Sequence, residues 1–106
     1  MSSTASRECK ESPLPQGVDE KLAYTVTTTP WAANPTSPVV VVKDLSTSPW
    51  VDVTTSVTTG SASVTGNVIT TPYIFGLTKN HDYRVEVKWS VASAIYECYF
   101  VLNAQE

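Results

Sequence analysis

The clearest pattern in the chain lies near its C-terminal end, over residues 83–91. Apolar and polar side chains alternate there, and the apolar phase contains Tyr83, Val85, Val87, Trp89 and Val91. Successive side chains of a β-strand point to opposite faces of its sheet, so this segment predicts an antiparallel strand with one buried and one exposed face. We expect the apolar phase to lie in the core of the protein.

A second alternating segment follows at residues 95–102, after a predicted tight turn. Phe100 and Leu102 share one phase with Cys98 and are predicted core residues. Tyr99 and Val101 occupy the opposite phase and should therefore be exposed. Neighbouring apolar residues on the outside of an edge strand often mark a partner surface, so Tyr99 and Val101 are candidate interface residues.

The rest of the chain is predicted to form short strands separated by turns. Val and Thr dominate after residue 24, and β-branched side chains favour pleated sheets over helices. The run at residues 39–42 is apolar on both faces, which indicates an interior or covered strand. Gly66 and Asn67 lie between two β-branched runs and predict a hairpin turn. Turn signals recur about every 8–12 residues, which predicts about seven strands in a sandwich or small barrel and no amphipathic helix.

The domain organisation follows from a change in composition near residue 17. Residues 1–17 are mostly polar, end in a Pro- and Gly-containing stretch, and are predicted to form a flexible N-terminal arm. Such an arm is suited to ordering against a neighbouring subunit. Residues 18–106 are predicted to form one β domain, and the absence of an apolar N-terminal region argues against a secretory signal.

The charge of the chain argues against two classes of partner. The formal net charge is −3, and the few basic residues are scattered rather than gathered in a stripe that could neutralise phosphates. We therefore expect no nucleic-acid partner. The longest apolar run covers only residues 39–42, far below the ~20 residues of a membrane span, so no membrane partner is expected either.

The residues that could carry chemistry are few. His81 is the single histidine, and a catalytic dyad needs a nucleophile held beside its base, so we expect no catalytic residues and a solvated His81 in a turn. Asp44, Asp52 and Asp82 could meet at one end of a sandwich and bind calcium, but their spacing resembles no calcium loop. They are predicted to be solvated turn acids, with no metal and no cofactor.

Cys9 and Cys98 are the two cysteines of the chain. A disulfide between them would require the polar N-terminal segment to lie against a late strand. We expect two free thiols instead, as in a protein assembled in a reducing cytoplasm.

Two of the three tryptophans are candidate interface residues. Trp89 belongs to the predicted core phase. Trp31 follows Pro30 in a predicted loop or edge, and Trp50 follows Pro49 at the start of a strand or strand pair predicted over residues 50–57. Each could pack against the sheet or anchor an interface, since aromatic residues dominate binding hot spots.

Two segments carry a resemblance to a known family. The stretch from Val18 to Trp31, with Tyr24 and a Thr-rich run, resembles the opening of small structural proteins of tailed bacteriophages. The stretch from Leu77 through Tyr83 to the final strand resembles the close of the same proteins. The Leu–turn–Tyr element is also similar to the entry to strand F of immunoglobulin-like and fibronectin-III-like sandwiches, where the Tyr hydroxyl bonds back to the chain upstream.

The resemblance implies an all-β fold, an immunoglobulin/fibronectin-III-like antiparallel β-sandwich. It implies a non-enzymatic structural protein of the virion, a fibre–tail adaptor or minor head–tail component assembled in the host cytoplasm. Its partners would be neck, tail or capsid subunits and copies of itself. Two alternatives stay open: a capsid decoration protein, and a carbohydrate- or adhesion-binding module of a surface protein that uses Trp31 and Trp50 as a sugar platform.

Overall fold

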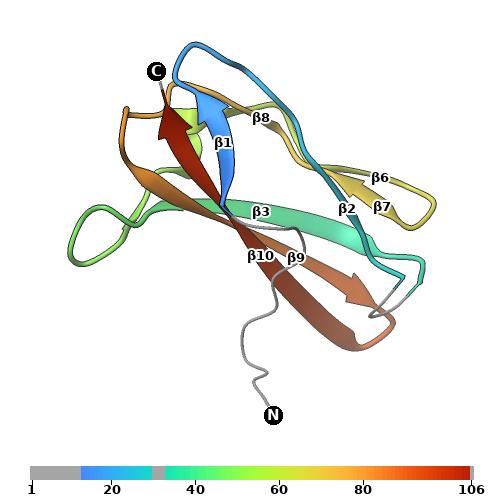
Figure 1. Cartoon of the computed structure of the whole chain (residues 1–106). Helices are drawn as coiled ribbons and strands as arrows, with labels where there is room; N and C mark the ends of the chain where they lie inside the picture. Colours follow the sequence, from blue (N-terminus) through green and yellow to red (C-terminus); the bar gives the residue numbers. More distant parts are fainter. Residues whose placement is uncertain (1–12, 30–32, 106) are drawn as a thin grey trace.

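The computed structural model describes residues 13–29 and 33–105, and the regular structure in these ranges is almost entirely β (Figure 1). The elements in chain order are β1 (Leu14–Gly17), β2 (Thr25–Thr27), β3 (Thr36–Asp44), β4 (Val51–Asp52), α1 (Thr54–Val57), β5 (Thr58–Thr59), β6 (Ser63–Thr65), β7 (Val68–Thr70), β8 (Tyr73–Ile74), β9 (Asp82–Val91) and β10 (Ala94–Gln105). The predicted all-β class is confirmed.

The strands form two main sheets and a small ribbon. The larger sheet has the order β1-β10-β9-β3-β4, the second has the order β2-β7-β6, and β5 pairs with β8. A bridge between Leu22 and Ile74 connects the segment before β2 with β8. The pairings are antiparallel except for β1 and β10, which run parallel. The interior position predicted for residues 39–42 is confirmed only in part: these residues pair with β9, but β4 pairs only with Lys43 and Asp44, and Val39 is 50% exposed.

One hydrophobic core joins the inner faces of these sheets. The three-stranded sheet contributes Val26 and Ile69, and β8 contributes Ile74. The larger sheet contributes the residues that the alternation predicted, each at most 2% exposed: Tyr83, Val85, Val87, Trp89, Phe100 and Leu102. The alternation is a reliable guide here because burial of one face fixes the register of a strand.

The N-terminal boundary differs from the prediction. Residues 14–17 were assigned to the arm, but they form β1, and Leu14 pairs with Leu102. Gln16 is 1% exposed, and its amide nitrogen donates to the carbonyl of Ile74 at 2.8 Å. A buried amide is tolerated when its polar atoms are bonded, which is why a polar sequence can form this strand. Residues 1–12, the rest of the predicted arm, lie outside the described residues.

The prediction of a free thiol at Cys98 was wrong. Cys98 is 2% exposed and disulfide-bonded, whereas Cys9 lies outside the described residues. The prediction treated the N-terminal segment as detached from the late strands, but β1 pairs directly with β10. Cys98 therefore gives no support to the argument for a reducing compartment.

The region expected to form a strand or strand pair at residues 50–57 also differs. It contains β4 and then one helical turn, α1, before β5 begins at Thr58. The predicted hairpin is confirmed, since Gly66 and Asn67 connect β6 to β7 and Gly66 has a φ of +60°. No helix in the described ranges is long and apolar enough to cross a membrane.

Candidate functional site

The outer face of the larger sheet carries most of the residues that the sequence singled out for binding. Side chains in the polar phase of β9 and β10 point away from the core, and the register sets Tyr99 opposite Glu86 and Val101 opposite Arg84. On the other side of β9, Lys43 of β3 also lies opposite Arg84. Residues from three strands therefore meet on one surface.

An arginine stacked between two aromatic rings forms the centre of this surface. The guanidinium carbon of Arg84 lies 4.1 Å from the ring centroid of Tyr99 and 5.9 Å from that of Trp50. A cation over an aromatic face is attracted by the ring quadrupole, so the three side chains hold one another in place. Trp50 is still 53% exposed. We call Trp50, Arg84 and Tyr99 the Trp50 face.

A carboxylate partly balances the positive charge at the Trp50 face. Glu86 lies 3.0 Å from Nε of Arg84 and 3.7 Å from Nζ of Lys43. Nε of Arg84 is buried and makes no well-aligned hydrogen bond, so its contact with Glu86 is ionic rather than a directed bond. In the part of the chain that the structure describes, the terminal nitrogens of this guanidinium also make no hydrogen bond. They remain able to bind a carboxylate in a bidentate geometry.

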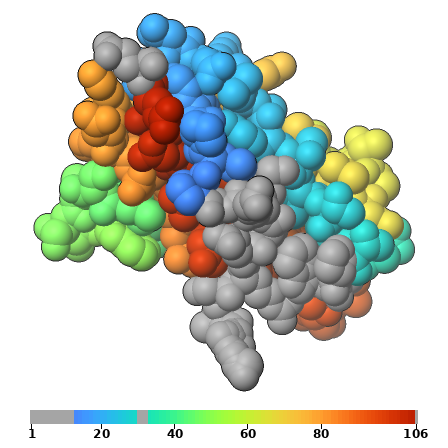
Figure 2. Space-filling model, in the orientation of Figure 1, coloured from blue at the N-terminus to red at the C-terminus, as the bar shows by residue number. Residues whose placement is uncertain are grey.

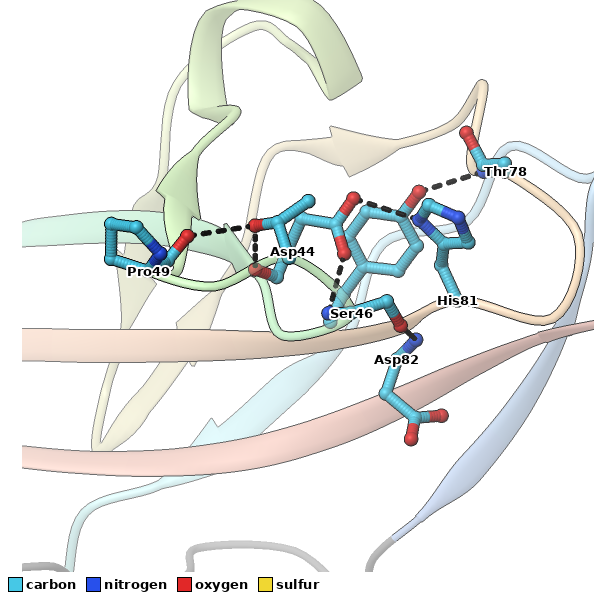
Figure 3. Close-up of polar contacts among 8 residues, drawn as sticks. Asp44, Ser46, Pro49, Thr78, His81 and Asp82 are labelled. Atoms are coloured by element: carbon cyan, nitrogen blue, oxygen red, sulfur yellow. Dashed lines mark hydrogen bonds and ion pairs between the residues drawn. The ribbon is translucent and has the colours of Figure 1, made fainter.

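The loop that presents Trp50 is fastened to the sheet at its start (Figure 3). One oxygen of Asp44 accepts a bond from the backbone N–H of Ser46 at 2.9 Å, and the other lies 2.9 Å from Nδ1 of His81. The backbone N–H of Asp82 donates to the Ser46 hydroxyl oxygen at 3.0 Å. In Figure 2 the green segment that includes this loop projects from one side of the molecule.

Hydrogen bonds inside the loop complete the fastening. The Thr47 hydroxyl donates to the carbonyl oxygen of Pro49 at 3.0 Å and lies 3.3 Å from that of Asp44. Leu45 donates its N–H to the carbonyl of Asp82 at 2.8 Å. The loop therefore places Trp50 in a defined position, which reduces the entropy lost when a partner binds.

Asp44 was predicted to be solvated, and this prediction was wrong, whereas His81 lies in a turn as predicted but is only partly exposed. The side chain of His81 is 33% exposed and that of Asp44 is 11% exposed, and the two are paired. His81 also stacks against the ring of Tyr83. The sequence missed the pair because the two residues lie far apart in the chain and meet only when β3 pairs with β9.

The three acids considered for calcium do not converge. Asp52 accepts bonds from Thr54, and Asp82 accepts a bond from the side chain of Asn103 at 2.6 Å, while Asp44 is engaged with His81. Residues 13–29 and 33–105 contain no group of three or more His, Cys, Asp or Glu side chains arranged to hold a metal ion.

Of the four candidate interface residues, the structure brings three to the same sheet face. Trp50, Tyr99 and Val101 are there, but Tyr99 and Val101 are partly buried rather than exposed as predicted. Trp31 lies outside the described residues. Arg84 was missed because its position in the polar phase of β9 gives it no distinguishing sequence signal; only the fold places it between two aromatic rings.

A second exposed aromatic group lies in the other layer. Nζ of Lys21 lies 5.6 Å from the ring centroid of Tyr73 and 5.8 Å from that of Phe75. Tyr73 is 52% exposed, while Ile74 beside it is fully buried in the core. We call Lys21, Tyr73 and Phe75 the Tyr73 face.

Among the described residues, Tyr24 and Asp52 have pKa values that are clearly shifted. Burial, followed by the nearby carboxylate of Glu20, raises the pKa of Tyr24 to about 12. The hydroxyl of Thr54, followed by its backbone N–H, lowers the pKa of Asp52, because both bonds favour the ionised carboxylate.

In comparisons with known proteins, no family model, curated protein or solved structure matches the chain.

Proposed function

We propose that this chain is a non-enzymatic structural protein of a tailed-phage virion, built as an immunoglobulin-like β-sandwich and joined to its partners through the Trp50 face. Its place is the tail, neck or fibre attachment region, and its partners are other virion subunits and further copies of itself. The family resemblance of the segments 18–31 and 77–102 supports the virion assignment.

Features of the fold support the immunoglobulin-like part of the proposal. The hydroxyl of Tyr83 accepts a bond from the backbone N–H of Thr78 at 2.7 Å, which matches the Tyr corner expected where strand F begins. The two sheets share one core, and the first strand pairs with the last. On the outer face of the larger sheet, Trp50 is 53% exposed and therefore available for contacts.

The observation that carries the functional proposal is the exposure of Trp50 on a rigid support. A Trp that is 53% exposed, stacked near an Arg and presented by a fastened loop, has the composition of a binding hot spot. Trp contributes a large contact area and Arg contributes directed hydrogen bonds. Both side chains are already held in place, so they lose little conformational entropy when a partner binds. A structural subunit needs a surface of this kind to hold its neighbour.

The test compares two exposed apolar residues in the assembled particle. Trp50→Ala should reduce incorporation of the protein into purified particles about tenfold or more, measured by quantitative mass spectrometry. Ile95→Ala removes a side chain that is 70% exposed and outside the Trp50 face, so its incorporation should equal that of the wild type. Absence of the wild-type protein from purified particles would refute the proposal.

The exposure of Trp50 also favours a second candidate, a carbohydrate-binding module. An exposed indole can stack on the apolar face of a sugar ring, and the exposed Asp52, two residues further along the chain, bonds to Thr54 through Oδ1 and has a second carboxylate oxygen that can accept a hydrogen bond. Binding of the isolated monomer to a glycan array, lost in Trp50→Ala and retained in Ile95→Ala, would favour this reading. Genes for terminase, portal or tail proteins beside this gene would favour the first.

A further inference from the structure

Cys98 of β10 belongs to a disulfide whose second cysteine lies outside residues 13–29 and 33–105. The side chain of Cys98 is 2% exposed and is part of the core cluster, opposite Val87 of β9. The two sulfurs of a disulfide lie about 2 Å apart, so a bond to another copy would require this core to open. The second cysteine therefore belongs to the same chain, and the sequence contains one other cysteine, Cys9.

The pairing of β1 with β10 directs the N-terminal segment towards Cys98. The two strands run parallel, and Leu14 at the start of β1 lies opposite Leu102. Cys98 comes four residues before Leu102 in the chain, and Cys9 comes five residues before Leu14. In this register residue 10 corresponds to Cys98, so Cys9 is one position away from a direct match.

The lengths of chain involved are compatible with a bond between Cys9 and Cys98. Leu102 and Cys98 are separated by about 13 Å of strand, at about 3.3 Å per residue. The five residues between Leu14 and Cys9 reach up to about 17 Å when extended, so Cys9 can lie level with Cys98. Neighbouring strands lie about 5 Å apart, which falls within the Cα–Cα separation of about 4.4–6.8 Å found in disulfides. The bond therefore requires no change in the described fold.

We propose that Cys9 is bonded to Cys98 and that this disulfide is a redox-controlled attachment of the N-terminal segment to β10. Its formation takes two protons and two electrons from the two thiols, and an oxidant of the disulfide class, such as oxidised glutathione, takes them up and becomes two thiols. A dithiol reductant reverses the reaction. In an oxidising compartment the segment is attached to its own sheet, and in a reducing compartment it is released.

The bond also stabilises the part of the fold that the sequence did not predict. A disulfide between residues 9 and 98 closes most of the chain into one loop, and long loops gain most from closure because the unfolded chain loses the most freedom. β1 has only four residues, all paired with the end of β10, so attachment of the preceding segment holds this short strand in place. The inference does not depend on the virion role.

Peptide mapping tests the pairing. The protein is equilibrated with oxidised glutathione, alkylated and digested with trypsin, which cleaves after Arg7, Lys10 and Lys88. Mass spectrometry should find residues 8–10 linked to residues 89–106, and dithiothreitol should separate them. Alkylation of both cysteines before reduction, mixed disulfides with glutathione on both, or dimers linked through either cysteine would overturn the proposal.

Thermal unfolding tests what the bond contributes. Under oxidising conditions Cys9→Ala should lower the Tm by about 10 °C or more. Dithiothreitol should lower the Tm of the wild type to that of Cys9→Ala and leave the variant unchanged. Ser6→Ala, in the same segment, is the matched control and should behave like the wild type. Cys9 is the better test position, because replacing the buried Cys98 would also disturb the core. Equal Tm values for oxidised wild type and Cys9→Ala would overturn the proposal.

Thiol reactivity tests whether reduction releases the segment. In reduced protein, iodoacetamide should modify Cys9 at least about tenfold faster than Cys98, because Cys98 remains buried while the released segment is open to solvent. A native far-UV circular-dichroism spectrum of reduced protein is expected alongside. Equal rates at the two cysteines, or loss of the native spectrum on reduction, would show that the bond is required for the fold and would overturn the redox-controlled attachment.

Discussion

Two tyrosines show how differently one residue type is used in this protein. Tyr83 is 2% exposed, and its hydroxyl accepts the N–H of Thr78. Tyr73 is 52% exposed and contacts Lys21 through its ring. The hydroxyl of Tyr83 therefore contributes to stability, whereas the ring of Tyr73 is available to a partner.

We expect Tyr83→Phe to lower the free energy of unfolding by about 1–2 kcal/mol, because the N–H of Thr78 loses its acceptor. Tyr73→Phe is the matched control and should change this free energy by less than about 0.5 kcal/mol, as is usual for surface changes. Urea denaturation followed by Trp fluorescence measures both. Equal effects of the two substitutions would contradict the role assigned to the Tyr83 hydroxyl.

The raised pKa of Tyr24 predicts how the free energy of unfolding changes at alkaline pH. Its pKa is raised from 10.0 to about 12, because burial and Glu20 both disfavour the phenolate. Because the pKa is raised in the folded state, the contribution of the neutral phenol to the free energy of unfolding is complete below pH 10. This contribution is lost as the pH rises towards 12.

The measurement compares wild type with Tyr24→Phe across this pH window. The wild type should lose stability more steeply than the variant as the pH rises, since only the wild type must ionise or expose this phenol. Chemical denaturation at fixed pH values, together with phenolate absorbance, measures the difference. Identical pH profiles would contradict the shift.

At the scale of elements, α1 connects the middle of the chain to the edge of the larger sheet. The hydroxyl oxygen of Thr54 accepts the N–H of Val42 in β3 at 2.9 Å, and the same hydroxyl donates to Asp52 at 2.6 Å. The N–H of Val53 donates to the carbonyl of Val42 at 2.9 Å. The short helical turn and the residue before it thus satisfy the backbone N–H and carbonyl of Val42 on this edge of β3. These groups would otherwise be free to pair with another strand.

Thr54→Val should therefore lower the free energy of unfolding by about 1–2 kcal/mol, because the N–H of Val42 is left without a partner. Hydrogen exchange of the Val42 amide should become faster in this variant. Thr55→Val is the control: Thr55 lies in the same helical turn but is exposed, so neither stability nor exchange at Val42 should change. An unchanged Val42 amide in Thr54→Val would contradict this account.

The same substitution tests the pKa of Asp52. In the wild type, the bonds from Thr54 lower this pKa below 3.8. Their contribution to the free energy of unfolding is therefore present above that pH and is lost as the pH falls through the lowered pKa. Carboxyl NMR titration should show the pKa of Asp52 rising in Thr54→Val. The Thr55→Val control should titrate like the wild type.

At the scale of the whole molecule, one core carries the fold. Phe100 is fully buried and its ring lies 5.3 Å from that of Tyr24, so it connects β10 with the segment leading into β2. A domain of this size has a stability of only about 5–15 kcal/mol, and removal of one large core side chain costs a large share of it.

Phe100→Ala should lower the free energy of unfolding by about 3–5 kcal/mol. Ile95→Ala, in the same strand but 70% exposed, should change it by less than about 0.5 kcal/mol. Thermal unfolding followed by far-UV circular dichroism measures both. A loss in Phe100→Ala no greater than in Ile95→Ala would show that the core does not depend on this ring.

The parts of the fold that could be predicted from the sequence are those set by local pattern. Alternation identified β9, β10 and their buried residues, and Gly66 with Asn67 identified the hairpin between β6 and β7. The end of the arm could not be predicted, because Leu14–Gly17 becomes a strand only where β10 offers an edge and Ile74 offers a partner for Gln16.

The candidate site divides in the same way. The sequence by itself identified Trp50, Tyr99 and Val101 as candidate interface residues, because residue type and position in a local pattern are read from neighbouring residues. Only the tertiary structure decided that Arg84 lies between Trp50 and Tyr99, that His81 pairs with Asp44, and that Cys98 is disulfide-bonded. The physical reason is distance along the chain: alternation is read from neighbouring residues, whereas these contacts join segments that only the pairing of strands brings together.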